Sequence, residues 1–180
     1  GTVLGEGAAI LSLETKEHFM RRGAKRHYCR VLGHGMSCDA HHATAPAPDG
    51  VQSERAVRVA LSESSLQPSD IGGIIPHATG TQLNDALESK LLRRVFGEHL
   101  DEVAISAIKA KLGHSSGAAS AFSILVASLA IYHGVLPANQ NTEHQAVDCN
   151  LPLHTGGPKR LSAPNVLVNA YAFGGNNISL

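Results

Sequence analysis

The hydrophobic positions of this chain fall into short unbroken runs and into stripes with helical spacing. Unbroken apolar runs of this length predict buried β-strands. They lie at 7–13, 28–32, 71–76, 103–108 and 165–172. The last run is almost continuously apolar, which predicts that its strand is buried on both faces of a sheet.

Three stretches between these runs have the spacing of amphipathic helices. They cover about 14–22, 53–64 and 83–96, and glycines at 23 and 97 predict where the first and the third end. In the third stretch an apolar residue recurs every four positions, at Leu83, Leu87, Leu91 and Val95. The charged residues of that stretch lie off the apolar stripe, at Asp85, Glu88, Arg93 and Arg94.

The segment 115–133 has no charged residue and is apolar nearly all round. A membrane-spanning helix needs about 20 apolar residues. Here three serines interrupt the apolar positions, and predicted strands and amphipathic helices flank the segment. We therefore predict a helix buried in the centre of a layered domain and no membrane span. Alternating strands and helices predict an α/β layered fold.

The stretch from 33 to 50 is rich in glycine, alanine, histidine and proline, and Pro46 and Pro48 exclude a helix there. It is predicted to be a long loop, and long loops in compact domains are commonly functional. The chain begins at Gly1 without a methionine, and its last residues, 176–180, predict the start of another strand. Both observations predict that the chain is a fragment of a longer protein.

Composition narrows the functions that this chain can have. Its 15 basic residues balance its 15 acidic ones, and four phenylalanines and three tyrosines are its only aromatic residues, so nucleic-acid binding is not expected. Eleven histidines suggest metal binding, but none has the spacing that lets one element present two ligands. Cys29, Cys38 and Cys149 are odd in number and irregularly spaced, which predicts free thiols in a reducing compartment. No signal peptide is evident, so a cytoplasmic location is expected.

Two histidines stand where a predicted strand gives way to a loop or a helix. His77 lies in Pro76-His77-Ala78-Thr79-Gly80-Thr81, and His114 directly precedes the 115–133 helix. Ser115 and Ser116 are typical N-cap residues, so His114 is expected beside the positive end of that helix. Burial and this field keep an imidazole neutral, and a neutral ring can still donate to a carbonyl oxygen. Taken singly, each histidine is equally consistent with a structural role.

Three motifs, taken in order, resemble the C-terminal half of the β-ketoacyl-acyl-carrier-protein synthases. They are His77-x-Thr79-x-Thr81, Lys109-x-x-x-Gly113-His114 and Phe173-Gly174-Gly175-x-Asn177. Further matches extend the resemblance over the whole chain, at Gly5-Glu6-Gly7-Ala8-Ala9, Gly35-Met36-Ser37-x-Asp39-Ala40 and Phe96-Gly97. The resemblance implies a thiolase-like fold of two similar halves, in which 1–25 ends the first half and 26–180 forms most of the second.

For catalysis, the resemblance implies a decarboxylative Claisen condensation in fatty-acid or polyketide synthesis. A cysteine nucleophile carries the acyl group, and His77 and His114 would donate to the malonyl thioester carbonyl while CO2 leaves. Lys109 would order the site electrostatically. The family's cysteine belongs to the first half and none of the three cysteines here matches it, so this chain alone is expected to be inactive.

For substrate binding, the resemblance implies that Thr79 and Thr81 contact the pantetheine arm. Phe173 would be an aromatic gate, with Gly174 and Gly175 giving its turn freedom to move. The implied partners are an acyl carrier protein and a second synthase subunit, identical or different. No cofactor is implied, because the substrates are carried on the phosphopantetheine of the carrier protein.

The chain departs from the family pattern at three positions. Ser123 stands where bacterial fatty-acid members often have a glutamate that partners the lysine, and Ala78 and Asn176 replace the commoner glycine and threonine. The alternative function is a non-catalytic partner subunit resembling a chain-length factor. Such partners commonly lose active-site residues, so the retained histidine pair favours the enzyme. A thiolase is disfavoured, because its second half carries a catalytic cysteine and none follows Cys149.

Overall fold

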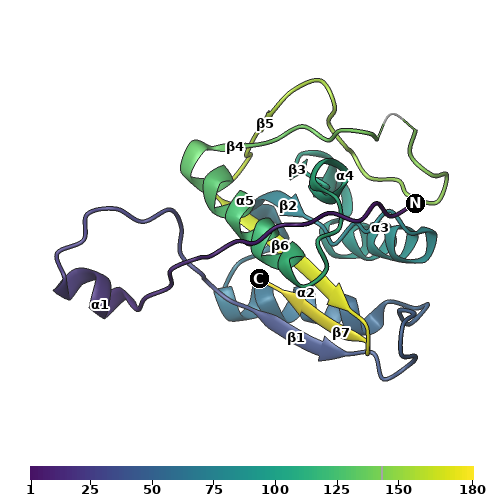
Figure 1. The fold of residues 1–180 in the computed structure, drawn as a ribbon, viewed down its shortest axis with the longest axis horizontal. Helices are drawn as coiled ribbons and strands as arrows, with labels where there is room; N and C mark the ends of the chain where they lie inside the picture. The colour runs from purple at the N-terminus through teal and green to yellow at the C-terminus, as the bar shows by residue number, and fades with distance from the viewer. Residues whose placement is uncertain (143) are drawn as a thin grey trace.

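The computed structural model describes residues 1–142 and 144–180 (Figure 1). Its elements in chain order are α1 (Lys16–Arg21), β1 (Gly35–Cys38), α2 (Val51–Ser64), η1 (Pro68–Asp70), β2 (Ile71–Ile75), α3 (Gln82–Phe96), η2 (Gly97–Asp101), β3 (Ala104–Ile105), α4 (Lys109–Leu112), η3 (Ser116–Ala118), α5 (Ala119–His133), β4 (Val135–Leu136), β5 (Lys159–Arg160), β6 (Asn165–Ala172) and β7 (Asn176–Ser179). The alternation of strands and helices confirms the α/β layered fold predicted from the sequence.

Five strands form the main sheet, in the order β1-β7-β6-β2-β3. β2 pairs in parallel with both β3 and β6, whereas β7 is antiparallel to both β6 and β1. The sheet is therefore mixed. β4 and β5 form a separate antiparallel pair. Because β2, β3 and β6 run in the same direction, the segments that follow all three begin at one edge of the sheet.

Helices cover both faces of this sheet. α2 and α3 pack together on one face, and α5 crosses the other face next to β6 (Figure 1). Neighbouring strand residues point to opposite faces. In β2, Ile74 joins the cluster with α2 and α3, and Ile75 joins the cluster with α5; Leu167 and Val168 divide in the same way. β6 is thus buried on both faces at its centre, as its apolar run predicts.

Helix α5 is less buried than its sequence predicts. Its buried residues are all alanines and serines, and the bulky Leu125, Leu129 and Tyr132 are 36%, 38% and 42% exposed. The prediction of a helix buried in the centre of a layered domain is therefore wrong for the described residues. Ser116–His133 is long and apolar enough to cross a membrane, but the core helices of soluble proteins meet the same criterion, so one such helix is weak evidence.

Two of the predicted strands do not form. The run at 7–13 is an extended arm without strand pairing, and its Ile10 is 96% exposed. The run at 28–32 is also irregular, with Tyr28 and Val31 each 53% exposed. In the described residues neither run has a neighbouring strand to accept its backbone hydrogen bonds, and an apolar run alone does not make a strand. The helix predicted near 14–22 is confirmed as α1.

Strand β1 lies within the stretch predicted to be a loop, and its position depends on a close approach to α2. Gly35 packs so tightly that an added Cβ would lie 1.9 Å from the Ala56 carbonyl oxygen and 2.8 Å from the Ala60 nitrogen. Both are backbone atoms of a helix and cannot move independently. The glycine therefore permits β1 to reach the edge of the sheet beside β7.

We expect Gly35→Ala to lower the free energy of unfolding by about 1–3 kcal/mol or more, because the methyl group forces β1 away from α2. Urea denaturation followed by circular dichroism measures this change. Gly156→Ala is the matched control, since a Cβ at Gly156 meets no atom within 4 Å. Equal stability of the two variants would contradict the close-packing explanation.

Candidate active site at the sheet edge

His77 lies immediately beyond the carboxyl end of β2 and is 8% exposed. Ala78, which follows it, has a φ of 40°, a left-handed conformation that is uncommon for a residue with a side chain. This sharp turn directs the His77 imidazole toward the segments that follow β3 and β6. Its ring centroid lies 6.0 Å from that of His114 and 5.3 Å from that of Tyr171.

Two buried charged side chains hold the His77 turn from opposite directions. The Glu88 carboxylate accepts hydrogen bonds from the backbone nitrogens of His77 and Ala78, both at 2.8 Å. The Lys109 ammonium donates to the His77 carbonyl oxygen at 2.5 Å. Asn169 of β6 also donates to Glu88, at 3.2 Å. The backbone around the strained Ala78 is therefore fixed by groups on three different elements.

His114 follows the short helix α4 and precedes η3. Its Nδ1 accepts a hydrogen bond from the Ser116 backbone nitrogen at 3.1 Å. Its own backbone pairs with the N-terminal arm, since His114 N donates to Val3 O at 2.7 Å and Gly5 N donates to His114 O at 3.1 Å. A Cβ on Gly5 would lie 2.3 Å from the Leu112 carbonyl oxygen, so only glycine permits this contact.

The sequence prediction about the cap of the following helix is corrected in one detail. Ser115 is the N-cap of η3, but its side chain makes no capping hydrogen bond, and α5 begins three residues after Ser116. The backbone nitrogen of Ser116 instead contacts the imidazole of His114. The local polarity is as predicted, because an N–H group at the start of a helix points at the histidine.

Both histidines are electrostatically disposed to remain neutral. Burial, reinforced by the charges of Lys109 and His114, lowers the pKa of His77 to about 3. Burial and Lys109 also lower the pKa of His114 below its usual range. Burial lowers the pKa of Lys109, although Glu88 and Asp85 oppose that effect. Near pH 7 the two imidazoles are thus neutral rings, each with one N–H to donate.

Glu88 is the residue that sequence analysis missed. It lies off the leucine stripe of α3, where a charged side chain is normally solvated, yet it is only 1% exposed. Burial raises the pKa of its carboxyl group, and the hydrogen bonds from Ala78, His77 and Asn169 oppose that shift. A signal was available: Asn84, Glu88 and Leu92 recur every four residues and form a second buried face of the helix.

Lys109 finds its acidic neighbours on α3 instead of on α5. Ser123 of α5 donates to the Ala119 carbonyl oxygen within its own helix. Glu88 and Asp85 are the carboxylates whose charges act on Lys109. Lys109 therefore has acidic neighbours, although the glutamate expected from the family pattern is absent.

The predicted substrate-binding residues are only partly brought together with the histidines. The Thr79 and Thr81 hydroxyls are hydrogen-bonded to each other at 2.8 Å. Phe173 is 76% exposed at the tip of the turn between β6 and β7. Gly174 and Gly175 have φ values of 84° and 79°, so the turn uses a conformation that glycine adopts readily.

A cavity of about 600 Å³ opens beside Lys109 and His114. Its walls include Thr79, Lys109, His114 and Asp85, together with residues of the 141–153 loop such as His144 and Cys149. His77, Thr81, Phe173, Gly174 and Gly175 do not line this cavity, although Pro76 and Ala78 on either side of His77 do. The volume suits a ligand of small-molecule size or a substrate arm.

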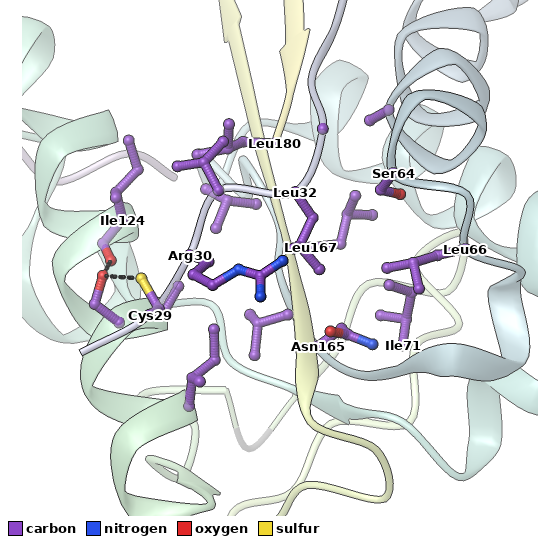
Figure 2. Close-up of a pocket in the computed structure, with 18 of the residues that line it drawn as sticks. Cys29, Arg30, Leu32, Ser64, Leu66, Ile71, Ile124, Asn165, Leu167 and Leu180 are labelled. Atoms are coloured by element: carbon purple, nitrogen blue, oxygen red, sulfur yellow. Dashed lines mark hydrogen bonds between the residues drawn. The ribbon is translucent and has the colours of Figure 1, made fainter. Parts of the chain in front are cut away.

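A second cavity lies between α2, β6 and α5 (Figure 2). Its volume is about 90 Å³ and its walls are largely apolar, and the Arg30 side chain extends among the residues that line it. Cys29 is hydrogen-bonded to Ser128 at 3.2 Å. None of the predicted site residues lines this cavity. Within 1–142 and 144–180, no group of three or more histidine, cysteine, aspartate or glutamate side chains is arranged to hold a metal ion.

Comparison with known proteins identifies the family. The family described as "Beta-ketoacyl synthase, C-terminal domain" matches residues 28–143. The chain belongs to the β-ketoacyl synthase family. This result confirms the resemblance drawn from the sequence motifs, and the mixed sheet with its covering helices is the thiolase-like fold of these enzymes.

Curated relatives cover the whole chain. It is 36% identical over 180 residues to 3-oxoacyl-(acyl-carrier-protein) synthase 2 of Synechocystis sp. and 40% identical over 185 residues to the mitochondrial 3-oxoacyl-(acyl-carrier-protein) synthase of Arabidopsis thaliana. The chain spans 43% and 40% of those proteins, less than half of their length. β-Ketoacyl synthases of the fatty-acid type are thus among its homologues.

Solved structures of polyketide enzymes are also similar to the chain. The ishigamide ketosynthase/chain length factor matches the whole chain with a TM-score of 0.90 and 40% identity, over 43% of the solved chain. A type II polyketide acyl-carrier protein in complex with its ketosynthase matches 92% of the chain and 40% of the solved chain, with a TM-score of 0.84 and 27% identity. The family is therefore established, and both pathways are represented among the relatives.

The low pKa of His77 predicts a pH dependence of stability. An unfolded histidine binds a proton near pH 6.5 and folded His77 only near pH 3, so the unfolded state binds more protons between these values. Stability should therefore fall as the pH drops below 6.5. In His77→Asn, the loss of stability between pH 7 and pH 5 should be smaller than in the wild type by about 2 kcal/mol.

Urea denaturation at the two pH values measures this difference. His41→Asn is the matched control, because it makes the same substitution at an exposed histidine. If His77→Asn showed the full wild-type loss between pH 7 and pH 5, His77 would not be held neutral by the fold.

Proposed function

We propose that this chain is the C-terminal portion of a β-ketoacyl-acyl-carrier-protein synthase that catalyses decarboxylative Claisen condensation. The observation that carries the proposal is the pair of neutral imidazoles, His77 and His114, with ring centroids 6.0 Å apart at the sheet edge. Two N–H donors at this separation can meet at one carbonyl oxygen. Preorganised donors lower a barrier most where negative charge develops.

In the proposed reaction, an acyl group is first bound as a thioester to a cysteine outside this chain. The bond between the malonyl α-carbon and its carboxylate then breaks, CO2 leaves, and the electron pair forms a thioester enolate. His77 and His114 donate to the enolate oxygen. The enolate carbon attacks the acyl-cysteine carbonyl, and the cysteine thiolate is expelled as the β-ketoacyl product forms.

Lys109 and Glu88 contribute by holding the His77 backbone in place. The Lys109 ammonium lies behind the turn and bonds its carbonyl oxygen, so its charge disfavours protonation of either imidazole. An imidazolium would transfer its proton to the enolate and quench the nucleophile. A neutral donor stabilises the enolate and leaves it free to attack carbon.

We further propose that the malonyl and acyl groups arrive on the phosphopantetheine of an acyl carrier protein, without a cofactor of the synthase itself. Thr79 lines the 600 Å³ cavity beside Lys109 and His114, which supports contact between its hydroxyl and the pantetheine arm. Thr81 would orient the Thr79 hydroxyl through the hydrogen bond between them. Phe173 would be an aromatic gate beside the cysteine, on a turn that Gly174 and Gly175 allow to move. The carrier-protein and chain-length-factor complexes among similar structures support a carrier-protein partner and a heterodimer. A homodimer is the other proposed assembly, and the proposed location is the cytoplasm.

The second candidate function is a non-catalytic subunit that resembles a chain length factor. It is considered because two similar structures contain a ketosynthase together with a chain length factor. The two candidates differ in the cysteine that the longer protein carries upstream. A cysteine at a strand-to-helix turn there supports the enzyme, whereas serine, glutamine or alanine supports the partner subunit.

In the full-length enzyme, His77→Ala should abolish decarboxylation of malonyl-carrier protein while acylation of the cysteine stays largely intact. The reason is that the imidazole acts on the enolate oxygen and not on the cysteine. Release of labelled CO2 and mass spectrometry of the acyl-enzyme measure the two steps. His41→Ala, which replaces an exposed histidine that does not line the cavity, is the control. Equal loss of both steps would mean that His77 serves the fold.

The isolated 180-residue chain should show no condensation, because none of Cys29, Cys38 and Cys149 matches the family's nucleophile. Cys149 lines the cavity, but burial and the nearby carboxylates raise its pKa, which disfavours the thiolate that a nucleophile needs. Incubation with acyl-carrier protein and malonyl-carrier protein, followed by mass spectrometry of the products, tests this expectation. Formation of β-ketoacyl product by this chain alone would overturn the assignment of the nucleophile to the other half.

A further inference from the structure

Tyr171 is the aromatic wall of the His77 site. It lies near the carboxyl end of β6, and its ring packs against the His77 imidazole with centroids 5.3 Å apart and planes tilted by 55°. The residue as a whole is half-buried, but its hydroxyl oxygen is completely buried. The proposed reaction assigns this hydroxyl no role.

The two touching rings each carry a buried polar atom without a partner. Neither Tyr171 Oη nor His77 Nδ1 has a hydrogen-bond partner in the described part of the chain. Buried polar groups normally find partners, so a pair of orphans in one contact calls for an explanation. Burial and the nearby Glu88 carboxylate raise the pKa of Tyr171 well above its usual range, so the phenol keeps its proton and is a donor.

His77 supplies the matching acceptor. A neutral imidazole has one N–H and one nitrogen with a free lone pair, and the environment decides which nitrogen carries the proton. In His114 this decision is local: Nδ1 accepts from the Ser116 backbone, so Nε2 carries the hydrogen. The described residues give His77 Nδ1 no corresponding backbone donor. The ring that packs against the His77 imidazole is that of Tyr171, and its phenol hydroxyl is the candidate donor to Nδ1.

We propose that Tyr171 is a positioning residue that fixes the tautomer of His77, its hydroxyl donating to Nδ1 through one bridging water molecule. The proton of the imidazole is then on Nε2, as in His114. Both histidines consequently present the same nitrogen as donor. The consequence for enolate stabilisation rests on the proposed function, whereas the tautomer itself does not.

Glu88 is the competing acceptor for the Tyr171 hydroxyl, because its carboxylate raises the pKa of Tyr171 both by its charge and by attracting the phenol proton. The hydroxyl is nevertheless outside hydrogen-bond distance of it. Its carboxylate already accepts from two backbone nitrogens and from Asn169. His77 Nδ1 accepts from no described group. The acceptor without any donor gains more from the phenol than the acceptor that already has three. A bond from Tyr171 to Glu88 would leave the His77 tautomer independent of the phenol, and the experiment separates the two cases.

The test uses the 180-residue chain with 15N-labelled histidine and two-bond 1H–15N NMR spectra, which assign the proton to Nδ1 or Nε2. In the wild type, His77 should be the Nε2–H tautomer. Tyr171→Phe keeps the ring and removes the donor, so the His77 resonances should shift toward a mixture of tautomers. His114 should be unchanged in the same spectrum, which reports that the site is still folded.

Tyr28→Phe is the matched control, because Tyr28 is 53% exposed and packs against Tyr132, far along the chain from either histidine. Its spectrum should match that of the wild type. The proposal is overturned if His77 is the Nδ1–H tautomer in the wild type. It is also overturned if Tyr171→Phe leaves the His77 nitrogens unshifted, the result expected when the hydroxyl bonds only Glu88.

A kinetic measurement on the full-length enzyme extends the test. Tyr171→Phe should lower kcat for malonyl decarboxylation about tenfold, the effect of losing one ordinary hydrogen bond, with KM little changed. If the wild-type enzyme itself fails to decarboxylate, the proposed function fails and the NMR result still decides the tautomer. If the wild type is active and Tyr171→Phe has the same kcat for decarboxylation, the positioning role is wrong and the proposed function stands.

Discussion

The arrangement of the site depends on one buried carboxylate. Glu88 is fully enclosed, and an enclosed charge is costly unless it is paired and hydrogen-bonded. Here it receives the backbone N–H groups of His77 and Ala78 and the side-chain amide of Asn169. These bonds offset part of the cost of its burial and simultaneously hold a turn in which Ala78 is left-handed. The same carboxylate thus links α3 to the ends of β2 and β6.

Lys109 completes this arrangement from the other direction. Its ammonium bonds the His77 carbonyl oxygen and lies in the field of Glu88 and Asp85, so the buried charges have opposite signs. Lys109 and Glu88 affect the pKa values of the two histidines unequally. The lysine is close enough to disfavour a positive imidazole, while the carboxylate contacts backbone atoms and not the rings. The site can therefore contain a lysine and a glutamate and still disfavour protonation of both histidines.

The sequence predicts the centre of the fold better than its margins. β2, α3 and β6 carry clear apolar patterns and form as expected, because their neighbours in the layers are present in the same chain. The apolar arm at 7–13 and the run at 28–32 have the same local signal and form no strand, since strand pairing depends on a partner that no local pattern specifies. His114 could be placed from its neighbours in sequence. Glu88 could not, because its burial results from the distant β6 and the His77 turn.

Topology explains why residues far apart in the chain meet at one edge. β2, β3 and β6 are parallel, and the carboxyl ends of parallel strands are where ligand sites form in open α/β sheets. His77 follows β2, Lys109 and His114 follow β3, and Tyr171 lies near the end of β6.

The alternate β6 residues Leu167, Asn169 and Tyr171 point to the same face of the sheet. On that face Leu167 lies in the apolar core, Asn169 donates a hydrogen bond to Glu88, and Tyr171 packs against the His77 imidazole. The packing that fixes the core therefore also fixes the distance between the core and the histidines, so the geometry of the site follows from the register of the sheet.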